Sequence, residues 1–398
     1  MQTLWQDLRC GARIFVASLT VAALAAGFSL TGAQNAPASQ AQPAAEISAA
    51  LQRALGEEVA ATPSLPGELL HVYAPKLGVQ RSFAAGLFDR ESKRRLEPQH
   101  VFRIASVTKT FVAAALLRLH EDGKLNIDDP LQRYLPQVYA EALEAGGYPT
   151  RTITLRHLLT HTSGLYDYAM DLRYMGTALK EPQHRWTRLE QVQFALKHGK
   201  PYFAPGAGYH YSDTGYVLLG EIVERVSRKD LAQALRTLLD FKKLGLKSTW
   251  LETLEPAPRE APELSHPYLG TRDTVAFDPS FDLYGGGGLV SSTEDLARFF
   301  RGLFTQQVFH KPQTLALMLE IPVVNRTGNA GNYALGIFRR NGGGEDCWGH
   351  SGFWGTEVYH CPRSDVTFAR HFNQAQPDKT FRSGELKLRL VELLGLGK

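Results

Sequence analysis

The stretch RIASVTKTFVAAALLRL, residues 103–119, predicts a buried helix that begins with a chemically suggestive pair of side chains. Ser106 and Lys109 lie three positions apart, and positions i and i+3 share one face of a helix. A serine hydroxyl becomes a nucleophile when a neighbouring base takes its proton, and a desolvated lysine can be that base or relay the proton. The spacing alone is common, and by itself it favours a serine cap beside an exposed lysine.

Two further stretches change that interpretation. The segment PGAGYHYSDTGYVLLGEIVERVS, residues 205–227, places Tyr211 and Asp213 just before an amphipathic helix. The segment WGHSGFWG, residues 348–355, places His350, Ser351 and Gly352 on a predicted strand, where a glycine lets another backbone approach closely.

In this order, and with ITLRHLLTHTSGL (153–165) and GGGGLVSST (285–293) beside them, the three motifs resemble those of a known superfamily. It comprises the serine β-lactamases and the D-alanyl-D-alanine carboxypeptidases, or penicillin-binding proteins. The resemblance is greatest to the branch with class C β-lactamases, related DD-peptidases and β-lactamase-fold esterases. It covers nearly all of residues 46–394.

The resemblance implies a role for each motif residue. Ser106 would attack a carbonyl and become acylated, and Lys109 would hold or relay the proton. Tyr211 would act as the base and later as the acid to the leaving group. The backbone N–H groups of Ser106 and Phe353 would form the oxyanion hole. His350 would hydrogen-bond Tyr211 or a carboxylate of the substrate.

Asp213, Ser351 and Gly352 would complete the substrate contacts, but Asp213 departs from the family pattern, which has asparagine there. An asparagine amide donates a hydrogen bond to a substrate carbonyl, whereas an ionised aspartate only accepts. Its charge should hold Lys109 protonated, repel a carboxylate near the scissile bond and favour a free amine there. A D-amino-acid amide or peptide is therefore a reasonable substrate, and efficient β-lactam hydrolysis is not expected.

The N-terminus has the pattern of a targeting segment. Arg9 and Arg13 precede the apolar run IFVASLTVAALAAGFSL, and small residues follow, which predicts a signal peptide over 1–33 with cleavage near Ala33. Residues 34–45, rich in Gln, Ala and Pro, indicate a linker. The prediction is an exported protein, periplasmic or secreted, with no membrane span after cleavage; an uncleaved anchor is the alternative.

The remaining chain, 46–394, predicts an α/β protein of the α+β type. Its antiparallel sheet would be built from both ends of the chain, 46–130 and 285–394, and flanked by N- and C-terminal helices. Residues 131–284 would form a mostly helical insertion, as in the β-lactamase/transpeptidase fold. The pattern also predicts a hairpin over 67–88, a short helix closed by Gly164, and a capping box in which Ser291 precedes Glu294.

The predicted strands of the second half and the closing helix are YALGIFRR, CWGHSGF, TEVYHC, VTFARHFN and SGELKLRLVELL, residues 333–394.

Two cysteines remain after signal cleavage, Cys347 and Cys361, one on each strand of a predicted hairpin. An even pair in an exported chain suggests a disulfide, and two free buried thiols are the alternative.

Composition excludes several classes of function. The formal net charge is +4 and no run of Lys and Arg indicates a nucleic-acid surface. No His, Cys and Asp cluster has metal-ligand spacing, and no glycine-rich phosphate loop follows a strand, so no metal or cofactor is predicted. His157 and His161 are interpreted as histidines that satisfy buried carbonyls.

The sequence therefore predicts a serine hydrolase that works through an acyl-enzyme on a small peptide, amide, β-lactam or ester. A carboxylesterase of the same fold and a non-catalytic binding protein are the alternatives. The oligomeric state is not predicted.

Overall fold

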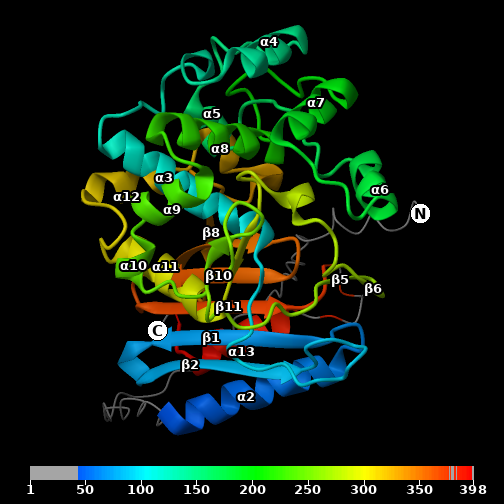
Figure 1. Ribbon diagram of the computed structural model, residues 1–398. Helices are drawn as coiled ribbons and strands as arrows, with labels where there is room; N and C mark the ends of the chain where they lie inside the picture. Colours follow the sequence, from blue (N-terminus) through cyan, green and yellow to red (C-terminus); the bar gives the residue numbers. More distant parts are fainter. Residues whose placement is uncertain (1–43, 376, 378–380, 382, 397–398) are drawn as a thin grey trace, which may run out of the picture. The chain divides into compact units, whose positions relative to one another are not determined.

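The computed structural model describes residues 44–375, 377, 381 and 383–396. The predicted signal peptide and most of the predicted linker lie outside these residues. Within them, a six-stranded antiparallel sheet has the order β2-β1-β11-β10-β9-β8 (Figure 1). The strands are β1 Gly67–Ala74, β2 Val79–Gly86, β8 Phe338–Asn341, β9 Asp346–Gly352, β10 Thr356–Cys361 and β11 Val366–Phe372. Both ends of the chain thus build one sheet, as predicted, because β1 pairs with β11.

Helices cover both faces of the sheet. On one face α2 (Ala44–Ala61) and α13 (Ser383–Leu393) pack over an apolar cluster with β1, β2, β10 and β11. On the other face α11 (Thr293–Phe304) packs against β1, β10 and β11. Because side chains alternate along a strand, neighbouring residues of β9 serve different cores: Cys347 belongs to the first and Trp348 to the second.

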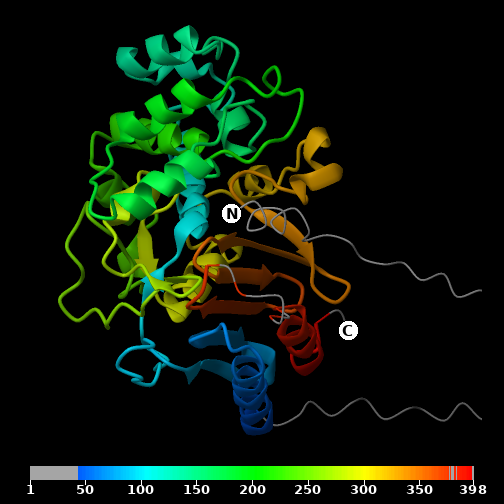
Figure 2. The same ribbon diagram turned by 90° about the vertical axis from the view of Figure 1, so that its right-hand side faces the viewer.

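The inserted part is mostly helical and gathers at the end of the molecule away from α2 (Figures 1 and 2). Its helices are α4 Gln137–Ala145, α5 Leu155–Leu159, α6 Leu172–Lys180, α7 Arg188–His198, α8 Asp213–Ser227, α9 Leu231–Leu238 and α10 Phe241–Leu244. The buried helix α3 (Thr108–Glu121) packs against α8 and α9 and so joins this part to the sheet. After α11 follows α12, Pro312–Met318.

A small three-stranded sheet positions the start of α3. Its strands are β3 Phe102–Arg103, β7 Leu289–Ser291 and β4 Trp250–Leu251, in the order β3-β7-β4. A separate two-stranded ladder joins β5 Tyr268–Leu269 to β6 Arg272–Asp273. The Ile104 N–H donates to Leu289 O at 2.9 Å, which fixes the turn that carries Ser106.

Three local predictions need correction. The first long helix begins at Ala44, inside the predicted linker. Helix α5 ends at Leu159 and not at Gly164, because His161 has a left-handed backbone with φ 57° that breaks the helix. The cap of α11 is Ser292, whose side chain accepts from the Asp295 N–H, so the predicted capping box at Ser291 is one residue early.

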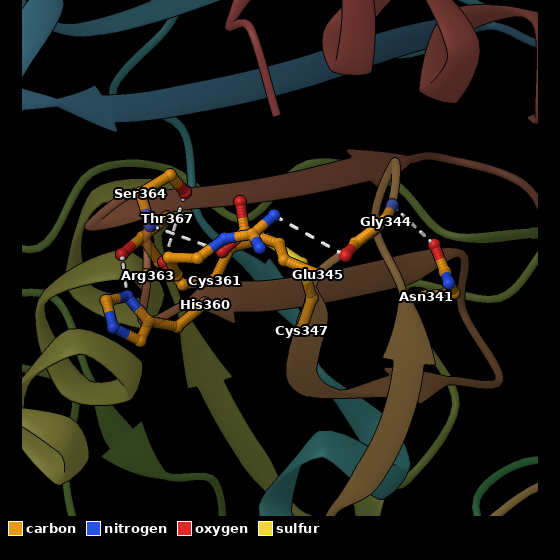
Figure 3. Close-up of a disulfide and its surroundings, with 9 residues drawn as sticks. All are labelled: Asn341, Gly344, Glu345, Cys347, His360, Cys361, Arg363, Ser364 and Thr367. Atoms are coloured by element: carbon orange, nitrogen blue, oxygen red, sulfur yellow. Dashed lines mark hydrogen bonds between the residues drawn. A yellow bond between two sulfur atoms is a disulfide. The ribbon is translucent and has the colours of Figure 1, made fainter. Parts of the chain in front are cut away.

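The predicted disulfide is present between Cys347 on β9 and Cys361 on β10 (Figure 3). Both cysteines are buried in the cluster under α2 and α13. The β8–β9 turn lies against the bridge, since a Cβ at Gly342 would meet Cys347 Sγ at 2.3 Å. The Asn341 side chain accepts from the Gly344 N–H at 2.8 Å and closes that turn.

Candidate active site

Ser106 and Lys109 stand where the short 3-10 turn Ala105–Val107 leads into α3. Ser106 is half-buried, while Lys109 is fully buried beneath it. Lys109 Nζ lies 2.9 Å from Ser106 Oγ, so the predicted i, i+3 pair is in hydrogen-bond contact. Ala105 has a φ of 44°, an uncommon conformation for a residue other than glycine, immediately before the serine.

The lysine has three hydrogen-bond partners, as many as an ammonium group has donors. Besides Ser106, Nζ lies 2.5 Å from Asp213 Oδ1 and 2.6 Å from the Gly286 carbonyl oxygen. Gly286 belongs to the glycine run before β7, where a Cβ would come within 2.8 Å of Asp213 Oδ1. The absence of side chains in this run is what lets the backbone reach the lysine.

Helix α8 brings Tyr211 and Asp213 to the same place from the inserted part. Asp213 is its first residue and is buried, and Lys109 Nζ lies 4.9 Å from the centre of the Tyr211 ring. Burial, and then the charge of Asp213, raises the pKa of Tyr211 well above its usual value, against a hydrogen bond with Ser106 that lowers it. Tyr211 is therefore a neutral phenol in the resting site, which disfavours the role of base that the resemblance implies for it.

A second carboxyl group, which the sequence did not single out, supports this arrangement. Asp167 Oδ1 accepts hydrogen bonds from the Asp213 and Ala169 backbone N–H groups, both at 3.1 Å. Burial, and then the charge of Asp213, raises the pKa of Asp167 well above its usual range. Asp167 thus fixes the start of α8, and its raised pKa disfavours a second negative charge beside Lys109.

His350 contacts different residues from those expected. Its Nδ1 lies 2.7 Å from Ser351 O, which only accepts, so Nδ1 carries a proton. Burial, and then the charge of Lys109, lowers the pKa of His350 to about 3, so the ring is neutral and Nε2 accepts. The partner of Nε2, at 3.2 Å, is the hydroxyl of Tyr333, not that of Tyr211. Both ring nitrogens are occupied, and contact with a substrate carboxylate remains a prediction.

The end of β9 lies against the serine turn. A Cβ at Gly352 would come within 2.2 Å of Ile104 O, which confirms the close backbone approach expected of this glycine. None of the described residues accepts a hydrogen bond from the Phe353 backbone N–H. That donor remains available, beside the Ser106 turn, for a developing oxyanion. Ser351 is exposed and on the opposite pleat from His350, and its predicted substrate contact is untested.

The two histidines of 153–165, which were predicted to satisfy buried carbonyls, each accept a hydrogen bond from a backbone N–H group through Nδ1. His157 Nδ1 accepts from the Thr154 N–H at 3.2 Å, and His161 Nδ1 accepts from the Ser212 N–H at 3.1 Å. The His161 ring also lies 4.1 Å from the Tyr211 ring, centre to centre. His161 therefore packs behind the tyrosine motif.

One group of side chains in the described part of the chain could hold a metal ion: Glu121, Asp122 and His310. The Glu121 carboxylate already accepts from the Lys311 N–H and the Thr314 hydroxyl, each at 2.7 Å, at the start of α12. This group lies at the far end of α3 from Ser106 and has a structural explanation. Among the residues described, no helix is long and apolar enough to cross a membrane.

The functional residues that sequence reasoning missed share a feature: they act through contacts distant in the chain. Asp167, Gly286 and Tyr333 are 46, 177 and 17 positions from the residues with which they form hydrogen bonds. The run of four glycines at 285–288 was the one local signal, since it permits close approach.

The amino-acid sequence matches known proteins over most of its length. Residues 64–392 match the family model described as Beta-lactamase. A penicillin-binding protein of Bacillus subtilis (strain 168) is 28% identical over 68% of this chain and 59% of its own length. Esterase EstB of Burkholderia gladioli is 31% identical over 58% of this chain and 64% of its own length.

Among solved structures, D-amino acid amidase from Ochrobactrum anthropi SV3 complexed with L-phenylalanine amide is 25% identical with a TM-score of 0.71. The match covers 88% of this chain and 98% of that chain. The chain belongs to the β-lactamase family and has its fold, as the sequence motifs predicted. It spans less than two thirds of the length of the two curated relatives named above.

Proposed function

We propose that this protein is an exported serine hydrolase that forms an acyl-enzyme on Ser106 and hydrolyses small amides or peptides with a free amine. The observation that carries the proposal is Lys109 Nζ, which bridges the Ser106 hydroxyl and the Asp213 carboxylate. A buried lysine bonded to a half-exposed serine is an arrangement suited to moving the serine proton. The N-terminal segment 1–33 supports export.

The proposed reaction uses these groups in turn. Ser106 Oγ bonds to the substrate carbonyl carbon while its proton passes to Lys109 Nζ, which passes one of its own protons to the Asp213 carboxylate. The N–H groups of Ser106 and Phe353 stabilise the oxyanion. As the bond to the leaving group breaks, Tyr211, a neutral phenol, donates its proton to that group and regains one from the Lys109–Asp213 pair. Water then attacks the acyl-enzyme by the same route and frees Ser106.

The charge around the site supports an amine-bearing substrate over a carboxylate-bearing one. The cation next to the nucleophile, Lys109, is already bonded to Asp213, and His350 is neutral. A substrate carboxylate would therefore meet no free cation among these residues and would face Asp213. The similarity to D-amino acid amidase, with an amino acid amide bound, supports the same substrate class.

A carboxylesterase is the second candidate, favoured by the 31% identity to esterase EstB. It would use the same acyl-enzyme with an alcohol as leaving group.

Labelling tests the nucleophile. A serine-reactive phosphonate should modify the peptide that contains Ser106, as found by mass spectrometry. Ser106→Ala should lose the label and lower kcat/KM roughly 10³-fold or more. Ser163→Ala is the matched control, because Ser163 is buried in the turn after α5 and should leave label and rate unchanged. Label on Ser163 or Ser351 would overturn the assignment.

The substrate class is tested on the same preparation with both enantiomers of phenylalanine amide, a penicillin and a nitrophenyl ester. Turnover of the ester alone would favour the esterase, and labelling without turnover of any substrate would favour a binding protein.

A further inference from the structure

A third acidic side chain, Asp282, lies in the segment that leads into the glycine run. This segment, Pro279–Asp282, is held rigidly by the inserted part. The Tyr174 hydroxyl donates to Phe281 O at 2.8 Å, and the Gln191 side chain donates to Ser280 O at 2.9 Å. The position of the Asp282 backbone is thus determined by its buried neighbours and does not depend on the carboxylate itself.

The carboxylate of Asp282 lies against the backbone that contacts the lysine. A Cβ at Gly287 would come within 2.1 Å of Asp282 Oδ1, and the preceding carbonyl, that of Gly286, accepts from Lys109 Nζ. The Asp282 carboxylate interacts with the like charge of Asp213 and with the opposite charge of Lys109. Asp282 is therefore a neighbour of the catalytic lysine on the side of the glycine run.

Asp282 has no cation of its own. No described residue donates a hydrogen bond to its carboxylate or forms an ion pair with it. The two cations that influence it are committed elsewhere: Arg103 binds Glu252 at 2.8 and 3.0 Å, and Lys109 binds Asp213. A partly desolvated carboxylate without a partner is unfavourable unless a ligand supplies one.

The accessibility of Asp282 distinguishes it from a sealed structural acid. The residue is half-buried, whereas Asp167 and Asp213 are buried. Burial, and then the charge of Asp213, raises the pKa of Asp282 to about 6, so it is ionised at neutral pH but at a cost that a cation would relieve. A primary ammonium group provides three donors and the missing positive charge.

We propose that Asp282 is a specificity-determining residue that binds the ammonium group of an amino-acid-derived substrate. The proposal rests on the proposed function, since it places that ammonium beside the acyl group attacked by Ser106. Asp213 is bonded to Lys109 and contributes only negative electrostatic potential at the substrate ammonium. Asp282 contributes the direct contact with that ammonium. An N-acylated substrate of the same shape has no charge to offer and loses this contact.

The test compares the purified full-length protein with Asp282→Asn, which keeps the shape packed against Gly287 and removes the charge. The matched control is Asp278→Asn, the acid that caps the start of this segment and pairs with Arg185 outside the site. The probes are phenylalanine amide, its N-acetyl derivative and nitrophenyl acetate. The readouts are kcat and KM for each, and the inhibition constant of each amide against nitrophenyl acetate.

We expect Asp282→Asn to raise KM, or the inhibition constant, of phenylalanine amide roughly 10- to 100-fold. The values for the N-acetyl amide and for nitrophenyl acetate should change less than about twofold, and the control variant should match wild type.

Three results would overturn the proposal. Equal losses for charged and neutral probes would make Asp282 a group that acts on Lys109 and not on the substrate. No change with phenylalanine amide would mean that the ammonium binds elsewhere. Equal inhibition of the wild-type protein by phenylalanine amide and its N-acetyl derivative would show that the protein does not prefer a free ammonium group. The proposed function would fail in a different way, if Ser106→Ala still hydrolysed nitrophenyl acetate. In that case the inhibition constants of the two amides would still test the role of Asp282.

Discussion

Two buried ion clusters of this protein have similar composition and different accessibility. In the first, Lys109 lies with Asp213 beneath Ser106; in the second, Arg370 of β11 lies with Glu68 of β1 and Glu58 of α2. Arg370 and Glu68 are both fully buried under α2, with Arg370 Nη2 2.6 Å from Glu68 Oε1. The first cluster instead opens through half-buried residues such as Ser106.

The comparison teaches what makes a buried ion pair functional. A buried pair is weak evidence for stability, because desolvation offsets much of its attraction. In the sheet cluster, the charges meet only protein groups, and removing one leaves an uncompensated charge. In the site cluster, the cation is bonded to Ser106, the proposed nucleophile, which is half-buried, so the free-energy cost of burying the charge can serve the proposed reaction.

Among the three changes predicted here, removal of Arg370, the cation of the sheet cluster, should lower the free energy of unfolding most. Arg370→Met leaves the Glu58 carboxylate without its cation and Glu68, which burial keeps protonated at neutral pH, without its buried partner, and should lower the free energy of unfolding by about 3–5 kcal/mol. Urea denaturation monitored by fluorescence measures the loss. The activity per folded molecule, normalised to the fraction labelled at Ser106, should stay at the wild-type value. Reduced turnover at full labelling would show that the two clusters are coupled.

Removal of the disulfide should also lower the free energy of unfolding, by a somewhat smaller amount. The disulfide shares the α2 and α13 face of the sheet with Arg370, whereas His350 lies on the other face. The double variant Cys347→Ala, Cys361→Ala should lower the free energy of unfolding by about 3 kcal/mol on a chain-entropy estimate for its loop.

Its kcat and KM, measured below the unfolding transition, should match those of the oxidised protein. A change in KM in that double variant, at full folding, would instead link the bridge to the Phe353 turn.

The smallest effect should come from Glu68→Gln. Burial, and then Glu58, raises the pKa of Glu68 from 4.5 to about 8 against the opposing charge of Arg370, so Glu68 holds a proton at neutral pH. Glutamine resembles that protonated form, and the variant should lose less than about 1 kcal/mol at pH 7.

The pH dependence gives the sharper test. A raised folded-state pKa means a contribution to stability that is full below pH 4.5 and is lost as pH rises through about 8. Urea titrations from pH 5 to 9 should show this decline in wild type and a flatter profile in Glu68→Gln. The exposed Glu57→Gln is the control and should keep the wild-type slope. A parallel decline in all three proteins would assign the effect to other groups.

Much of the fold could be predicted from local patterns. Ile47, Leu51 and Leu55 share one helical face and are buried, and the hairpin of β1 and β2 forms where alternation indicated it. The errors fell at element ends, such as α5, where His161 adopts a left-handed backbone and its ring lies against that of Tyr211, a residue distant in the chain.

The sequence by itself determined the catalytic candidates, because Ser106 and Lys109 are one helical turn apart and any helix at this place brings them together. It also determined the sheet and the cysteine pair, through alternation and spacing.

Only the tertiary structure decided what surrounds these groups. Gly286 O reaches Lys109 across 177 positions, and Tyr333, not Tyr211, occupies His350. Asp282 has no cation partner among the residues that the structure describes, and Arg103, whose charge acts on it, is bound to Glu252. The physical reason is that protonation, charge balance and accessibility depend on every group within a few ångströms, and the chain brings those groups from segments that have no local pattern in common.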